Sequence, residues 1–159
     1  VVVEAAKLMQ EEDHIHFHIF GDGMYKERLQ HEAEGLSNIS FWPMQPSELA
    51  PSIYAMADVN VIPLAPNIYR TALPSKTATC IACQKPIIFC IGKDSTFGKK
   101  LEDQEGYYLV NSSDSDELRD AILKIENLHP YINSSALYKE MFAKTENSKK
   151  YSELIVASR

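Results

Sequence analysis

Apolar residues recur along the chain with two periods that alternate. Runs in which every residue or every second residue is apolar predict strands, and apolar residues spaced three and four positions apart predict helices. The predicted strands span 14–20, 38–42, 59–62, 86–91 and 106–110. The predicted helices span 1–12, 24–34, 47–57, 74–84, 95–102, 115–125, 132–143 and 146–156. This alternation predicts an α/β fold: a Rossmann-like, doubly wound parallel sheet with two C-terminal helices.

Small polar residues and a proline mark several of the predicted helix starts. Ser47 and Ser115 stand where a side-chain oxygen can accept a hydrogen bond from the free N–H groups of a first helical turn. Pro74 suits a first turn as well, because the N–H group that proline lacks has no partner there. We therefore expect Ser47 and Ser115 to be N-caps, and Pro74 to lie in the first turn of its helix.

The composition is that of a soluble globular domain. Of the 159 residues, 45% are hydrophobic and 24% are charged. No apolar run approaches the roughly 20 residues that a membrane helix needs. The net charge of −6 disfavours nucleic-acid binding, which requires a basic face, but it permits a small anion site. Because the chain begins with Val1 and carries no leader pattern, we expect a fragment of a longer enzyme.

Two patterns raise the question of metal or redox chemistry. His14, His16 and His18 share one face of strand 14–20, but neighbours two apart on a strand lie about 6.5–7 Å apart, so three seldom converge on one ion. Cys80 and Cys83 form a C-x-x-C pair late in a helix, with no second ligand pair nearby. We interpret the histidines as a polar strand face and these cysteines as small buried side chains, and we expect no metal. The cysteine content favours a reducing compartment.

The stretch 67–88 is the strongest candidate site. It begins as a polar loop after a buried strand, passes through Pro74-Ser75-Lys76 and becomes a helix. A loop that opens a helix at the end of a parallel strand is a natural phosphate site, although it can equally be a plain crossover connection. Gly21-Asp22-Gly23 starts a dinucleotide fingerprint, but Lys26 replaces its third glycine. Because parallel strands end at one edge, we expect 21–23, 43–46 and 63–76 to line one crevice.

Seven short motifs follow one another in a fixed order. They are Phe20-Gly21-Asp22-Gly23, Ile39-Ser40-Phe41-Trp42-Pro43, Ala57-Asp58-Val59, Val61-Ile62-Pro63, Ala82-Cys83-Gln84-Lys85-Pro86-Ile87-Ile88, Gly106-Tyr107-Tyr108-Leu109-Val110 and Leu118-Arg119-Asp120-Ala121-Ile122. In this order the chain resembles the C-terminal, donor-binding domain of GT-B glycosyltransferases. It is most similar to the large retaining family that includes bacterial capsule and exopolysaccharide transferases, and to the subset that carries Pro-Ser-Lys.

The resemblance implies a donor site for a nucleotide-diphosphate sugar, UDP-linked rather than GDP-linked, with no cofactor. The diphosphate would lie at Pro74, Ser75 and Lys76, and the loop with Gly21 and Gly23 would approach the donor closely. The remaining donor-binding candidates are Trp42 and Met44 beside the base, Asn67, Arg70 and Thr71 near the sugar, and Thr79 near the ribose. The resemblance identifies no catalytic residue in this chain.

The chain departs from the family pattern at four positions. Thr71 and Thr79 stand where the family has the two carboxylates of a Glu-x7-Glu motif, and Gln84 and Pro43 replace glycines. The missing carboxylates favour one alternative, a non-catalytic nucleotide-binding α/β module. A second alternative is a GT-B sugar-nucleotide epimerase, which would need catalytic carboxylates, and few Asp or Glu residues follow the relevant strand ends.

The resemblance also sets the expected domain organisation. Residues 1–130 would form the donor-nucleotide-binding domain, and residues 131–159 would form helices that pack on it or towards an N-terminal domain. The first strand of the family's sheet would precede Val1, so we expect either a gap in the strand order 3-2-1-4-5-6 or a different order. We expect the 159-residue chain not to transfer sugar by itself.

The expected partners follow from the same resemblance. They are the nucleotide sugar and a saccharide or lipid-linked acceptor, which the N-terminal domain would bind. We expect a cytoplasmic enzyme, and peripheral association of the full-length protein with the inner face of the membrane remains open.

Overall fold

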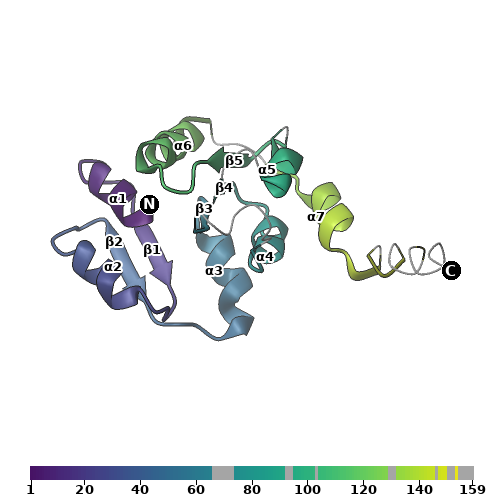
Figure 1. Cartoon of the computed structure of the whole chain (residues 1–159), viewed down its shortest axis with the longest axis horizontal. Coiled ribbons are helices and arrows are strands. Elements are labelled where there is room, and N and C mark those ends of the chain that lie inside the picture. The colour runs from purple at the N-terminus through teal and green to yellow at the C-terminus, as the bar shows by residue number, and fades with distance from the viewer. Residues whose placement is uncertain are drawn as a thin grey trace.

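The computed structural model describes residues 1–65, 74–91, 95–102, 104–128, 132–145, 147–149 and 153. Helices and strands alternate along this described chain (Figure 1). The strands are β1 (Phe17–Phe20), β2 (Ile39–Trp42), β3 (Asn60–Pro63), β4 (Ile87–Cys90) and β5 (Tyr107–Val110). The helices are α1 (Val2–Leu8), α2 (Lys26–Glu32), α3 (Ala50–Met56), α4 (Thr77–Ala82), α5 (Thr96–Leu101), α6 (Ser115–Leu128) and α7 (Ser135–Phe142), with a 3-10 turn, η1 (Ser47–Leu49), before α3. All five predicted strands are confirmed, although β1 begins at Phe17 rather than at His14.

The strands form two parallel sheets. β1 pairs with β2, and β3, β4 and β5 form the second sheet in that order. Phe17 lies opposite Ile39 in the first sheet, and Ile87 lies opposite both Asn60 and Tyr107 in the second. Within the described residues no ladder joins the sheets, and β1 is drawn between β2 and the second sheet (Figure 1). Among the described residues the break therefore lies between β1 and the second sheet. Of the two arrangements that the sequence predicted, a gap or a different strand order, the structure shows the gap.

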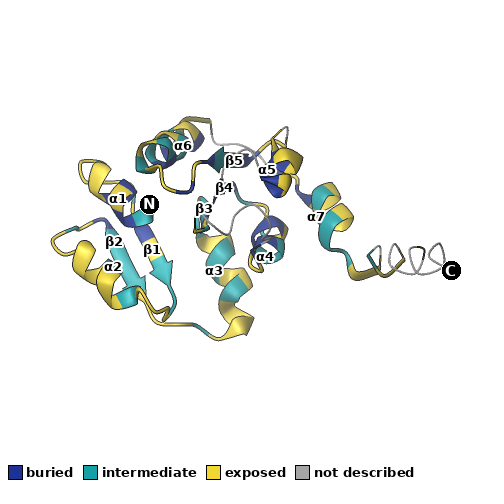
Figure 2. Cartoon of the chain, viewed as in Figure 1, coloured by how far each residue is buried: buried dark blue, intermediate teal, exposed yellow. Residues whose placement is uncertain are grey.

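Strand β4 lies at the centre of the fold and is buried on both faces. All four of its residues have no exposed surface, as the unbroken apolar run predicts (Figure 2). Its side chains alternate between two cores. Ile88 and Cys90 pack with residues of α1, β1 and α6, whereas Ile87 and Phe89 pack with residues of α4 and α5. Helices thus cover both faces of the second sheet, which confirms the doubly wound arrangement.

The first core connects the two sheets although no ladder does. It contains Ala5, Ala6, Met9, Phe17, Ile88, Cys90, Val110, Leu118, Ile122 and Ile125. Phe17 belongs to β1 and Ile88 to β4, and α1 packs against α6 above them. Apolar burial of this kind stabilises a fold by about 25 cal/mol for each Å² removed from water. Hydrophobic packing rather than strand pairing therefore holds the β1–β2 unit in place.

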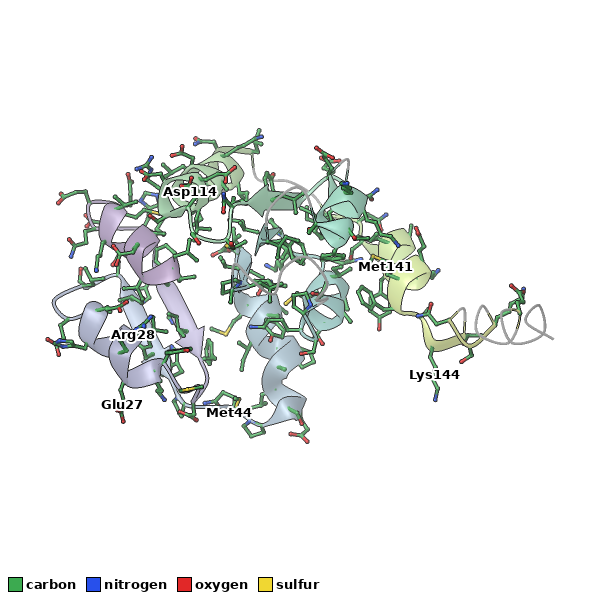
Figure 3. The ribbon with its side chains drawn as sticks, in the orientation of Figure 1. Glu27, Arg28, Met44, Asp114, Met141 and Lys144 are labelled. Carbon is green, nitrogen blue, oxygen red and sulfur yellow. The ribbon has the colours of Figure 1, made fainter. Side chains whose placement is uncertain are left out.

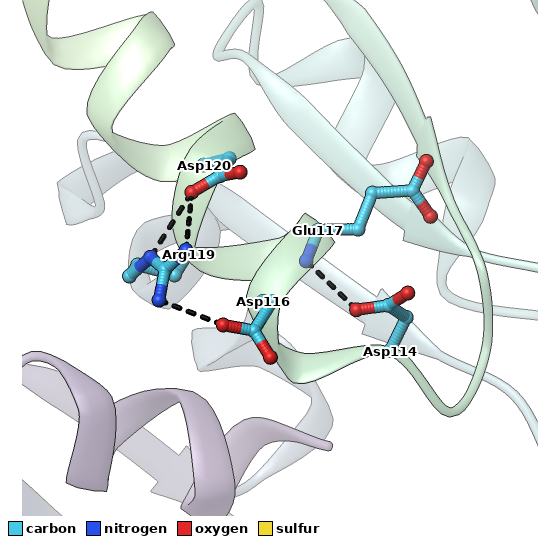
Figure 4. A network of polar contacts seen from close by, with 5 residues as sticks. All are labelled: Asp114, Asp116, Glu117, Arg119 and Asp120. Atoms are coloured by element: carbon cyan, nitrogen blue, oxygen red, sulfur yellow. Dashed lines mark hydrogen bonds and ion pairs between the residues drawn. The ribbon is translucent and has the colours of Figure 1, made fainter.

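The structure corrects both N-cap predictions. Helix α6 begins at Ser115, and the residue before it, Asp114, is the cap: its Oδ1 accepts a hydrogen bond from the N–H of Glu117 at 2.9 Å (Figure 4). Ser47 opens the 3-10 turn η1, and no side-chain hydrogen bond caps η1 or α3. Pro51 lies in the first turn of α3, where it removes one of the free N–H groups that a cap would satisfy.

The C-terminal part of the described chain leads outwards from the sheets (Figure 1). The predicted helix 132–143 is confirmed as α7, and Leu137 and Met141 of α7 pack against the second core. Ile132 is buried in that core. The predicted helix 146–156 lies mostly outside the described residues. In the part of the chain that the structure describes, every helix is too short or too polar to cross a bilayer.

Candidate functional site

Two loops meet at the carboxyl ends of β1 and β2. The N–H of Gly21 donates a hydrogen bond to the carbonyl oxygen of Trp42 at 3.1 Å. Gly21 has a φ of 141°, a conformation that residues with a Cβ rarely adopt. The space where a Cβ would stand is open at both Gly21 and Gly23. The structure therefore brings the 21–23 loop beside the 43–46 loop and leaves the backbone of the first accessible.

Asp22 fastens these two loops together. Its Oδ2 accepts a hydrogen bond from the N–H of Met44 at 2.7 Å, and its Oδ1 accepts one from the Lys26 ammonium group. The bond from Lys26, and then the bond from Met44, holds the pKa of the Asp22 carboxyl below its ordinary value. Met44 itself is 67% exposed at the edge of the molecule (Figure 3). The sequence analysis missed this role of Asp22, although an acidic residue between two glycines was a signal that could have found it.

The indole of Trp42 lies back over the exposed face of the β1–β2 sheet. It stacks on Phe20 with the ring centroids 6.0 Å apart and an angle of 16° between the planes. Its Nε1 lies 3.0 Å from Nδ1 of His18. Trp42 is 43% exposed, so one side of the indole faces solvent. The residue predicted to border the base is thus held by two side chains of β1.

Pro74, Ser75 and Lys76 form a turn that leads from the β3 side of the second sheet into α4. The N–H of Thr77 donates to the carbonyl oxygen of Pro74 at 3.0 Å, and the helix begins at Thr77. Pro74 therefore precedes the first helical turn instead of lying in it, which corrects the prediction. Ser75 and Lys76 are exposed, whereas Pro74 is buried. Two of the three residues predicted to bind the diphosphate are accessible to a ligand.

The remaining predicted donor residues divide into two groups. Thr79 is half-buried within α4, and its carbonyl oxygen accepts a hydrogen bond from the N–H of Cys83. The predictions for Asn67, Arg70 and Thr71 fall on residues outside those that the structure describes.

Thr77 is a polar residue of α4 that has no exposed surface. Its Oγ1 has no hydrogen-bond partner among the described residues. The first residue of α4 therefore brings a buried hydroxyl next to the turn at Pro74.

The cysteines are free and mostly buried. Burial raises the pKa of the Cys80 thiol to about 12, so this side chain remains protonated at neutral pH. Burial also raises the pKa of Cys83, whose Sγ lies 3.4 Å from the carbonyl oxygen of Pro51. The interpretation of both as small buried side chains is confirmed for Cys80, and Cys83 is half-buried.

The three histidines of the first strand region do not act as a set. His14 pairs with Glu126 of α6, with 2.6 Å between Nε2 and Oε1. The rings of His16 and His18 lie 4.7 Å apart, but the indole N–H of Trp42 can only donate, so Nδ1 of His18 accepts. The neutral His18 ring then keeps its proton on Nε2, which leaves no free lone pair for a metal. In the described residues no three metal-ligating side chains gather around one point.

A hollow of about 420 Å³ lies along β5 and α6. Its charged lining residues are Glu102, Glu117, Asp120 and Lys124. Three carboxylates against one ammonium group disfavour a diphosphate, because like charges repel at short range. This hollow is therefore a poor candidate for the donor site.

Comparison with known families agrees with the order of strands, loops and glycines described above. The model of the family Glycosyl transferases group 1 matches residues 1–127, which is most of the chain. The match spans β1 to β5, together with the Gly21–Gly23 loop and the Pro74–Lys76 turn. No curated protein matches the chain. The chain belongs to the glycosyl transferases of group 1, and its α/β fold is consistent with the C-terminal half of a GT-B enzyme.

Proposed function

We propose that this chain is the donor-binding domain of a retaining, hexosyl-type glycosyltransferase of polysaccharide biosynthesis. It binds a nucleoside-diphosphate sugar, UDP-linked rather than GDP-linked, and needs no further cofactor. Residues 1–130 form the nucleotide-binding unit, and residues 131–159 form helices that pack on it or towards an N-terminal domain. Ile132, which is buried in the second core, supports that packing.

The observation that carries the proposal is the pair of joined loops at the carboxyl ends of β1 and β2. Ligands of open α/β sheets bind outside the carboxyl ends of the strands. There the backbone at Gly21 and Gly23 is accessible, and Asp22 fixes the position of Met44. A fixed loop with an accessible backbone loses little conformational entropy when a nucleotide binds.

The diphosphate binds at the turn Pro74–Lys76. The exposed Lys76 ammonium group offers a point charge, and Ser75 beside it offers a hydroxyl group. The first turn of α4 begins at the same place, and its backbone N–H groups after that of Thr77, which bonds to Pro74, have no partner in a preceding helical turn. The same groups stabilise the negative charge that develops on the departing diphosphate.

Transfer breaks the bond between the sugar C1 and the diphosphate oxygen and forms one between C1 and the oxygen of an acceptor hydroxyl. The proton of that hydroxyl leaves with the departing diphosphate. Binding both substrates in one orientation supplies a large part of such a rate enhancement. The acceptor, a saccharide or a lipid-linked saccharide, binds to a second domain. The enzyme works in the cytoplasm or at the inner face of its membrane.

Calorimetric titration of the chain with UDP, GDP and NAD tests the proposal. We expect binding of UDP, weaker binding of GDP and none of NAD. Lys76→Ala should weaken UDP binding by about tenfold, because one charge-assisted hydrogen bond contributes at least about 1.5 kcal/mol.

Lys7→Ala is the matched control for Lys76→Ala. Lys7 is an exposed lysine of α1, which leads into the amino end of β1, at the edge opposite to the proposed site. We expect this variant to bind UDP as the unchanged chain does. Binding of NAD without UDP, or equal effects of the two lysine substitutions, contradicts the proposal.

The non-catalytic module remains the second candidate, because Thr79 stands where the family has a carboxylate. It predicts UDP binding that no acceptor converts into transfer when the enzyme is assayed together with its acceptor domain. The epimerase alternative predicts instead that UDP-linked sugars change configuration without any acceptor.

A further inference from the structure

One face of the β1–β2 sheet carries a row of imidazole and aromatic side chains. His18 and Phe20 point to this face from β1, and Ser40 and Trp42 point to it from β2. His16, which directly precedes β1, contacts His18 on the same face. Their contacts form a connected set: His16 contacts His18, and Trp42 contacts both His18 and Phe20. Ser40 Oγ lies 2.8 Å from Nε2 of His16. Trp42, the last residue of β2, is thereby connected through His18 to His16 and Ser40.

The chemistry of the Trp42–His18 hydrogen bond fixes the state of the imidazole. An indole N–H can only donate, so Nδ1 of His18 has to offer a lone pair across the 3.0 Å contact. Protonation of His18 places a hydrogen on that nitrogen and converts the acceptor into a second donor. The hydrogen bond exists only while His18 is neutral.

We propose that His18 is a positioning residue for the nucleotide site. Its neutral imidazole holds Trp42 and so keeps the 43–46 loop, which is expected to border the base, in its binding conformation. The inference rests on the proposed function for its effect on the nucleotide, but not for its effect on Trp42. It predicts that acidification releases the indole and loosens the loop.

The hydrogen bond between Trp42 and His18, called the tether below, can act on the 43–46 loop because Trp42 directly precedes this loop in the chain. The carbonyl oxygen of Trp42 accepts the N–H of Gly21, and two residues later the N–H of Met44 binds Asp22. The segment Trp42–Met44 is thus held by three hydrogen bonds: from the Trp42 indole to His18, from Gly21 to the Trp42 carbonyl oxygen, and from Met44 to Asp22. When the bond to His18 is lost, the other two still hold the segment.

The groups that face His18 determine the pH at which the tether breaks. Directly before β1 the facing titratable group is His16, and the groups that face His18 from β2, Ser40 and the Trp42 indole, are uncharged. Desolvation, and then the charge of His16, lowers the pKa of His18 below 6.5. The tether is therefore intact at neutral pH and is lost as the pH falls through this lowered value.

Intrinsic fluorescence tests the tether directly, because Trp42 is the single tryptophan of the chain. A protonated imidazole quenches a neighbouring indole more strongly than a neutral one. We expect the emission to titrate with a midpoint below 6.5. His18→Gln should abolish this titration, since the Gln carbonyl oxygen accepts the indole N–H at every pH. His16→Gln should move the midpoint upwards, because it removes a neighbouring charge.

His31→Gln is the control, because it removes an exposed imidazole on α2 that pairs with Glu34. It should titrate as the unchanged chain does, and far-UV circular dichroism should report the same fold for all variants. An unchanged titration in His18→Gln, or a flat profile in the unchanged chain, overturns the tether.

UDP binding at pH 5.5 and 7.5 tests the positioning role. Because the terminal phosphate of UDP also titrates near pH 6, the comparison is made between variants. On acidification the unchanged chain should lose about two- to tenfold more affinity than His18→Gln, the effect of one hydrogen bond. Equal losses overturn the positioning role. No UDP binding at either pH refutes the proposed function and with it the positioning role, whereas the fluorescence result still decides the tether.

Discussion

Replacement of Asn38 by alanine should destabilise the fold, because the Asn38 side chain joins α1 to the β1–β2 unit. Asn38 lies directly before β2 and is only 6% exposed. Its Nδ2 donates to the carbonyl oxygens of Ala6 at 2.8 Å and of Met9 at 3.1 Å, at the end of α1. The backbone carbonyl oxygen of Asn38 accepts a hydrogen bond from the N–H of Phe17, the first residue of β1. The side chain thus fastens α1 to the β1–β2 unit.

The magnitude follows from what each partner retains. Two neutral hydrogen bonds contribute a net of about 1–3 kcal/mol. The carbonyl oxygen of Ala6 keeps a bond from Met9, and that of Met9 keeps one from Glu12, so neither acceptor is left unpaired. The Oδ1 of Asn38 is buried without a partner among the described residues, and its removal offsets part of the loss. We therefore expect Asn38→Ala to lower the free energy of unfolding by about 1–2 kcal/mol.

Urea unfolding at pH 7, followed by circular dichroism, measures this loss. Asn127→Ala is the matched control, because Asn127 Nδ2 makes the same kind of bond to the carbonyl oxygen of Leu123, at 2.7 Å, but in an exposed position. Water replaces that bond, so the control should change stability by less than about 0.5 kcal/mol. In thermal unfolding the Asn38 variant should melt roughly 2–8 °C lower. Equal stabilities of the two variants would refute the argument that burial makes the Asn38 bonds matter.

Two further predictions concern the glycine loop and the cysteines. Gly21→Ala should cost about 1–3 kcal/mol in urea unfolding, because its φ of 141° strains any residue with a Cβ. Gly23→Ala, with the same open surroundings and no positive φ, is the control, and equal losses contradict the strain argument. Cys80 and Cys90, whose pKa values burial raises to about 12, should resist Ellman's reagent at pH 8 until the chain unfolds. Since the folded state holds these protons more tightly, stability should fall as the pH rises above 9.0, the ordinary thiol value, and unchanged stability between pH 8 and 10 would contradict this.

The sequence located the elements well because their signals are local. The apolar run at β4 needs both faces covered, and the two cores cover them. The exact start of each helix was less predictable from the sequence. Ser115 and Asp114 are both good N-cap residues, and only the observed start of α6 at Ser115 selects Asp114. Ser47 has the right chemistry, but Pro51 changes how the following helix begins.

For the site, the sequence pointed to the glycine loop and to the turn at Pro74. It could not show that Asp22 joins the 21–23 loop to Met44, because that contact spans 22 residues of chain. The hydrogen bond between His18 and Trp42 was equally unpredictable, because these residues are 24 positions apart in the chain. Such pairs depend on the strand register, which places residues of β1 beside residues of β2.

The sequence by itself determined the fold class, the family and the approximate position of every described strand, because periodicity and motif order are properties of neighbouring residues. Tertiary structure alone decided which polar side chains meet. The parallel register of β1 and β2 brings His18 to Trp42, and the turn at Gly21 brings Asp22 to Met44. A break in the sheet was one of the two arrangements that the sequence predicted, but the packing of α1 on α6, which bridges the break, appears only in three dimensions. These side-chain pairs and this helix packing join residues that are far apart in the sequence, so no pattern of neighbouring residues predicts them.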